Sequence, residues 1–196
     1  MHKIFTAVIL AAFSVSAHSA TLLMNSDELA GASGVNVNGT LYDVSFFSGS
    51  CTSVYDDCDA TSDFTFQTAA DADAASAALL NQVFINIDGF SFDDSPELTV
   101  DCVGTQQCQI WTPYLVNSGG VDSKIAFNKW NITGEDWDSL GSGHAAAHAI
   151  GTNLPADHLW AKWAVSEVQV VPVPAAVWLF GSALAGLGWL RRKQTI

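Results

Sequence analysis

Alternating apolar and polar residues dominate the middle of the chain. The clearest run is residues 35–47, where two alternating stretches flank Gly39 in the pattern of a hairpin with one buried face. Similar runs predict strands at 63–67, 83–87, 107–115, 123–132 and 158–171. The alanine-dense residues 69–82 predict one helix, which Thr68 and Asp71 begin with a capping-box arrangement. The predicted fold class is mostly β, a sandwich or barrel-like domain with one short helix.

The first 20 residues have a different pattern. Lys3 precedes the uncharged, mainly apolar residues 4–15, and small residues follow up to Ala20. This is the layout of a secretory signal peptide, with three compatible cleavage positions between Ala17 and Ala20. The apolar stretch is too short to span a bilayer permanently. The alternative to a signal peptide is a buried N-terminal helix. The signal-peptide interpretation leaves residues 21–170 as an exported domain.

A second apolar segment, residues 175–190, lies near the other end of the chain between a proline motif and a basic cluster. The motif and the cluster are Val171, Pro172, Val173, Pro174 and Ala175, and Arg191, Arg192 and Lys193. As a helix, the segment would span roughly 24 Å, less than the ~30 Å hydrocarbon core. The basic cluster favours a cytoplasmic end, which leaves the acidic domain outside the membrane. These residues alone fit either an ordinary single-span anchor or a processed signal.

This tail resembles the PEP-CTERM class of C-terminal sorting signals, in its VPLPA variant. The match covers residues 171–193, with Val173 where the variant usually has leucine. The resemblance implies a Gram-negative host, an exosortase in the inner membrane that cuts near the motif, and a transient or permanent single-pass membrane anchor. It further implies a place in the envelope or biofilm matrix, with exopolysaccharide as a partner. Residues 34–114 also resemble a recurrent domain of exported PEP-CTERM proteins, which brings no known activity.

Charge narrows the range of partners. All 20 carboxylates lie between Asp27 and Glu167, where only three of the seven basic residues, Lys124, Lys129 and Lys162, are found. Three positive charges against 20 negative ones give this region a net charge of −17. Such a surface repels phosphate backbones and anionic lipid headgroups, so we expect no nucleic-acid partner. Calcium or a polyhydroxylated sugar surface is tolerated better.

Four cysteines lie in the exported domain: Cys51, Cys58, Cys102 and Cys108. An even number of cysteines in an exported chain predicts disulfides. Three pairings are open, and the local one, which closes two short polar loops, is favoured. Neither spacing is the C-x-x-C of redox or zinc sites, so a four-cysteine metal site is the weaker alternative.

Carboxylates are densest in the loop around Cys58, where Asp56, Asp57 and Asp59 are followed by Asp63. Closely spaced carboxylate oxygens suit calcium, which takes six to eight oxygen ligands. The D-x-D-x-D-G loop with its distal glutamate is absent, so a solvated acidic loop is favoured over a calcium site. Sparser acidic clusters lie at residues 89–97 and 134–139.

Three histidines are candidate metal ligands: His144, His148 and His158. In a helix the first two would share one face with their Cβ atoms about 6 Å apart; in a strand they would lie ~13 Å apart, too far to share an ion. The sequence leaves helix and strand open. The H-E-x-x-H and G-x-S-x-G motifs are both absent, and we assign no catalytic residue.

Tryptophan is the last candidate feature, because an exposed indole can stack on a sugar ring although tryptophan more often fills the core. The exported domain contains Trp111, Trp130, Trp137, Trp160 and Trp163. The sequence therefore predicts an exported envelope or matrix protein with no evident enzymatic activity. A carbohydrate- or calcium-binding surface module is the first alternative, and a histidine–metal hydrolase is the second.

Overall fold

The computed structural model describes residues 19–87, 89–104, 106–130, 138–146 and 150–167. Those up to Ser166 belong to one compact unit. The signal segment up to residue 18, Trp137, His148 and the sorting tail lie outside the described residues. Within the described part of the chain, no helix is both long and apolar enough to cross a membrane.

The described residues form nine strands and two α-helices, with two short 3-10 turns between them. The strands are β1 (Thr21–Asn25), β2 (Glu28–Val37), β3 (Thr40–Phe47), β4 (Asn86–Ile87), β5 (Phe90–Ser91), β6 (Gln107–Asn117), β7 (Gly120–Lys129), β8 (Ser139–Ala146) and β9 (His158–Val165). The helices and turns are α1 (Cys51–Val54), η1 (Thr61–Asp63), α2 (Ala69–Gln82) and η2 (Pro96–Leu98). The prediction of a mostly-β domain with a helix at residues 69–82 is confirmed.

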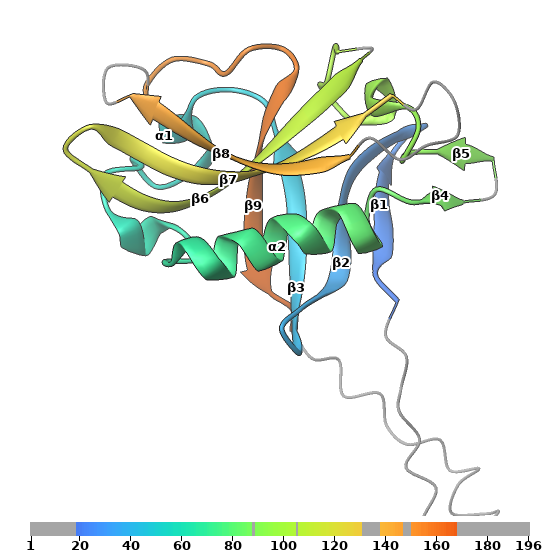
Figure 1. Ribbon diagram of the computed structural model, residues 1–196, viewed down its shortest axis with the longest axis horizontal. Coiled ribbons are helices and arrows are strands. Elements are labelled where there is room, and N and C mark those ends of the chain that lie inside the picture. Colours follow the sequence, from blue (N-terminus) through green and yellow to red (C-terminus); the bar gives the residue numbers. More distant parts are fainter. Residues whose placement is uncertain (1–18, 88, 105, 131–137, 147–149, 168–196) are drawn as a thin grey trace, which may run out of the picture. The chain divides into compact units, whose positions relative to one another are not determined.

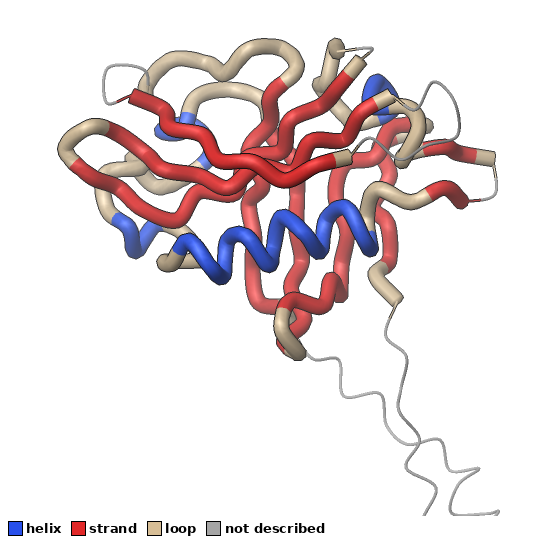
Figure 2. Tube along the Cα trace, viewed as in Figure 1, coloured by secondary structure: helices blue, strands red, loops and turns tan. Residues whose placement is uncertain are grey.

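Seven strands form a single sheet in the order β1-β2-β3-β9-β6-β7-β8, and β4 and β5 form a separate small hairpin. Neighbouring strands are antiparallel except β6 and β9, which are parallel. The sheet is open, with β1 and β8 at its ends, and Figure 2 shows its strong twist. Among the described residues there is thus one large sheet, where the sequence predicted a sandwich or barrel. A helix covers the face that a second sheet would cover in a sandwich.

Helix α2 is that cover, and it has the predicted bounds. The Thr68 hydroxyl accepts a hydrogen bond from the Asp71 backbone N–H (3.2 Å) and donates one to the Asp71 carboxylate (2.7 Å), which caps the first turn. The buried side of the helix consists mainly of small residues: Ala72, Ala75, Ser76, Ala78 and Leu79. This side contacts β2, β6 and β7 (Figure 1).

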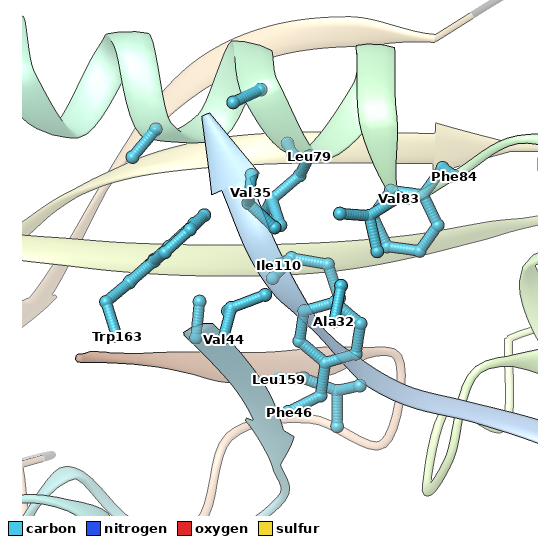
Figure 3. Close-up of a cluster of buried hydrophobic side chains, with 14 of the residues drawn as sticks. Ala32, Val35, Val44, Phe46, Leu79, Val83, Phe84, Ile110, Leu159 and Trp163 are labelled. Carbon is cyan, nitrogen blue, oxygen red and sulfur yellow. The ribbon is translucent and has the colours of Figure 1, made fainter. Parts of the chain in front are cut away.

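The main core lies between α2 and the sheet. Leu79 of α2 and Val83 just beyond its end meet apolar side chains from the sheet (Figure 3). The sheet side of this core includes Ala32, Val35, Val44, Phe46, Ile110, Leu159 and Trp163. Burial of each large apolar side chain contributes roughly 1.5–3 kcal/mol, so this interface is a main source of the fold's stability.

A second buried cluster covers the opposite side of β6, β7 and β9. Its members are Cys51, Val54, Tyr55, Cys58, Phe64, Trp111, Val121, Ile125, Ala145 and Trp160. The Tyr55 hydroxyl donates to the Ala161 carbonyl oxygen (2.8 Å), and the Tyr55 ring meets Trp160 edge-on, with 6.0 Å between centroids. The loop around α1 therefore packs against the sheet as part of the core.

Two predicted strands differ in the structure. Residues 63–67 form no strand, although Phe64 and Phe66 are buried and Thr65 is exposed, as alternation requires. The Thr65 hydroxyl donates to the Trp163 carbonyl oxygen, so a side chain and not a backbone ladder attaches this segment to β9. Of residues 83–87, only β4 is strand.

Candidate functional site

Both disulfides have the predicted local pairing. Cys51 pairs with Cys58 and Cys102 with Cys108, with Cα–Cα distances of 5.8 and 6.0 Å. All four cysteines are therefore in disulfides, and none is left as a thiolate metal ligand or nucleophile. Two disulfides in a small domain indicate folding in an oxidising, extracellular or periplasmic compartment.

The acidic loop does not gather its carboxylates. Asp56, Asp57 and Asp59 are exposed, whereas the Asp63 carboxylate turns back to accept hydrogen bonds from the backbone N–H groups of Asp59 (3.1 Å) and Ala60 (3.0 Å). Across the described ranges, no three histidine, cysteine or acidic side chains are arranged to hold a metal ion. Calcium binding at this loop stays a hypothesis, without support from its geometry.

His144 lies on β8, so the strand alternative holds at this position. Its Nδ1 is 2.5 Å from an Asp122 carboxylate oxygen, and its Nε2 is 3.0 Å from the Gly119 carbonyl oxygen. Both partners only accept hydrogen bonds, so the doubly protonated ring satisfies both of them. The Asp122 hydrogen bond, followed by the Gly119 one, raises the pKa of His144. An imidazolium has no lone pair for a metal, which disfavours His144 as a ligand in this arrangement.

His158 lies at the start of β9, and its ring is on the other face of the sheet. Its Nδ1 is 2.7 Å from an Asp157 carboxylate oxygen, and its ring centroid is 5.6 Å from that of Trp111. Ala145 is in the Trp111 cluster, and a Cβ on Gly143 would meet the Trp111 ring at 2.5 Å. Because neighbouring side chains of a strand alternate, His144 points away from this face. The structure therefore does not bring the imidazoles of His144 and His158 together.

The contact between His144 and Asp122 predicts that the stability of the fold depends on pH. Because the folded state raises the His144 pKa, the stabilisation is complete below pH 6.5, the ordinary value, and is lost as the pH rises through the raised value. An NMR titration of the ring should give a pKa above 6.5, and Asp122→Asn should return it toward 6.5. The control is Asp157→Asn, which should leave the His144 titration unchanged. A wild-type pKa at or below 6.5 would contradict the pairing.

Most of the candidate tryptophans are core residues. Trp160, Trp163 and Trp111 are 1%, 6% and 9% exposed, whereas Trp130 is 48% exposed. Trp137 lies outside the described residues. Trp130 is therefore the one described tryptophan with an indole open enough to stack on a sugar, and the buried ones stabilise the fold.

A groove of 390 Å³ lies beside Trp111 and His158. His144 also lines this groove, although its ring is hydrogen-bonded to Asp122 and Gly119. The other walls of the groove come from the end of β8 and from residues 152–155, including Asn153 and Leu154. The Leu154 backbone N–H donates to the Gly49 carbonyl oxygen (3.1 Å), which fixes this loop to the segment before α1. The groove is partly apolar. Because Trp111 is little exposed, a ligand in the groove could reach little of its ring.

A second groove, of 350 Å³, lies between the β2–β3 turn and the start of α2, and the sequence reasoning missed it. We call it the neutral groove. Its polar walls are Asn38, Thr40, Tyr42, Thr65, Gln67 and Asp71. The nearest signal in the sequence was the Asn-Gly turn, but that turn marks the hairpin and not its contact with residues 65–71.

The chain matches no family model, no curated protein and no solved structure. What the molecule can do is therefore argued from its own side chains. Both described histidine rings contact carboxylates, and neither contacts a hydroxyl or thiol among the residues that the structure describes. A groove with hydrogen-bonding side chains beside a partly exposed aromatic ring, such as the neutral groove, is suited to binding a small molecule.

Proposed function

We propose that this protein is an exported, non-enzymatic component of the cell envelope or extracellular matrix, processed at its C-terminus by an exosortase. The observation that carries the proposal is the pair of disulfides, which places the folded domain in an oxidising compartment. The signal-peptide pattern and the tail at residues 171–193 support the route and the processing from the sequence. The net charge of −17 in the central region keeps the domain away from anionic surfaces.

Calcium binding and histidine–metal hydrolysis receive less support. A calcium site would need oxygens that converge, whereas Asp56, Asp57 and Asp59 are exposed, and the described residues contain no group of three or more such side chains placed to hold a metal ion. A histidine–metal hydrolase would need the imidazoles of His144 and His158 to converge on one ion, whereas each ring contacts its own carboxylate, Asp122 and Asp157 respectively. His148, the third candidate ligand for that metal, lies outside the described residues.

The processing can be tested by intact-mass analysis of the exported protein. In the host, we expect a form without the residues after about 175, and hence without Arg191 and Arg192. In a host that lacks the exosortase, the same measurement should return the complete tail. An identical C-terminus in both hosts would contradict the proposal and favour a plain anchor.

A matched variant tests the role of the proline motif. Prolines disfavour helix both at their own positions and in the residue before them, which leaves the segment extended for a protease. The double variant Pro172→Ala and Pro174→Ala keeps the apolar segment and the basic cluster, so it should retain the tail. Pro155→Ala, a proline exchange within the folded domain, is the control and should be processed normally.

A further inference from the structure

The neutral groove brings together three segments that are distant in the sequence. Asn38 is in the β2–β3 turn, Tyr42 is on β3, and Gln67 precedes α2. Its volume of 350 Å³ is within the about 300–1,000 Å³ typical of small-molecule sites. The groove is therefore large enough for a small ligand.

Most of its hydrogen-bonding side chains are uncharged and uncommitted, although the Thr65 hydroxyl donates to the Trp163 carbonyl oxygen. The amides of Asn38 and Gln67 and the hydroxyls of Thr40 and Tyr42 have no hydrogen-bond partner among the residues that the structure describes. The one carboxylate, Asp71, already contacts the Thr68 hydroxyl. Amides and hydroxyls both donate and accept, which is what a ligand with several neighbouring hydroxyls requires.

The groove also has an aromatic wall whose orientation is fixed. The Tyr42 ring packs against Phe66 at 5.0 Å between centroids and meets Trp163 edge-on at 6.3 Å. Tyr42 nevertheless stays partly exposed, unlike Trp111 in the other groove. A sugar ring has an apolar face that stacks on such a ring while its hydroxyls reach the polar walls.

Other ligand classes fit this groove less well. Strand β3 is paired on both sides, with β2 and with β9, so an extended peptide has no strand edge to join here. A polyanion is repelled by the net charge of −17 in the central region. A neutral, hydroxyl-rich molecule satisfies the polar groups without either penalty.

We propose that the neutral groove binds a neutral saccharide, with Tyr42 stacking on a sugar ring and Asn38 and Gln67 hydrogen-bonding to its hydroxyls. This inference goes beyond the proposed export and processing, because it concerns the folded domain alone. Purified protein with either C-terminus can be tested, so failure of saccharide binding and failure of tail processing are distinguishable.

The test is calorimetric titration of the purified protein with cellohexaose, laminarihexaose and mannohexaose, and with an oligogalacturonate as an anionic probe. At least one neutral hexasaccharide should bind, and the oligogalacturonate should bind at least about tenfold more weakly. The double variant Asn38→Gly and Gln67→Ala should lower the affinity at least about tenfold, since each hydrogen bond contributes a severalfold factor. Glycine at position 38 keeps the backbone, where φ is +52°, unstrained.

The matched controls are Asn153→Gly beside Trp111 and Gln106→Ala in a different surface depression. Both remove the same amides from exposed positions and should change the affinity less than twofold. Tyr42→Phe, which keeps the ring, should weaken binding severalfold, and circular dichroism checks that each variant is folded. The proposal is overturned if no neutral hexasaccharide binds at millimolar concentration, or if the controls weaken binding as much as the groove variants.

Discussion

Replacing Trp160 with alanine is expected to lower the free energy of unfolding by about 3–5 kcal/mol. Trp160 is 1% exposed, and its ring meets Tyr55 and Trp111 edge-on at 6.0 and 5.9 Å between centroids. Its indole N–H donates to the Gly49 carbonyl oxygen (3.2 Å). The variant would lose these contacts, leave a cavity and remove one of that carbonyl's two donors, the other being the Leu154 backbone N–H. Since whole domains are stable by only about 5–15 kcal/mol, much of the fold's stability would be lost.

Chemical denaturation followed by circular dichroism measures this loss, and the chain provides a control of the same chemistry. Trp130→Ala removes an identical side chain, but one that is 48% exposed. Its effect should be within about 0.5 kcal/mol, as for most surface substitutions. If the two variants lost stability equally, burial of the cluster around Trp160 would be contradicted.

Alternation of apolar and polar residues predicted the burial of side chains more accurately than it predicted which residues form strands. Strands β3 and β6 and helix α2 were predicted nearly to their bounds, because their patterns are long and regular, whereas β7 begins three residues before its predicted start. At residues 63–67 the pattern gave Phe64 and Phe66 correctly as buried, yet no ladder forms there. Alternation reports on which side of the backbone a residue lies, whereas a strand also needs a neighbouring strand with free hydrogen-bonding groups.

Two glycine-containing strands were largely missed. Residues 28–34 of β2 and most of β8 were not predicted, because glycine is depleted in strands and usually marks turns. β1, which contains no glycine, was missed as well. In β8 the glycines make room for aromatic rings from other strands. A Cβ on Gly141 or Gly143 would come within 2.5 Å of the Phe127 or Trp111 ring, respectively. That requirement comes from side chains that are distant in the sequence, so no local pattern contains it.

The candidate sites show the same difference between local contacts, which a sequence pattern can predict, and contacts between distant segments, which it cannot. The disulfides could be predicted because each closes a loop of fewer than ten residues, with sequence separations of 7 and 6. The opposite directions of His144 and His158 could not, since they depend on which faces of β8 and β9 are buried. The neutral groove joins Asn38 and Tyr42 to Gln67 through the packing of α2 on the sheet. The groove exists only because of that packing, which cannot be predicted from the spacing of residues along the sequence.

Gly31 shows how strictly one of these glycines is required. It lies in β2, paired with Leu23 of β1 on one side and with Ser45 of β3 on the other. Its φ is +153°, and a Cβ placed there would be 2.1 Å from the Val44 carbonyl oxygen and 3.0 Å from the Ser45 Cα. Both atoms belong to the backbone of β3, so no side-chain rotation can relieve the overlap.

Gly31→Ala is therefore expected to destabilise the fold by about 3 kcal/mol or more, because β2 must separate from β3 to accommodate a methyl group. Gly151→Ala is the control: its Cβ would meet nothing within 4 Å, and the change should be within about 0.5 kcal/mol. Denaturation midpoints measure both variants, and backbone amide exchange should rise along β2 and β3 in the first alone. Equal midpoints for the two variants would contradict the close approach of these strands. The β2–β3 hairpin also carries Asn38 and Tyr42, so Gly31→Ala should weaken saccharide binding as well.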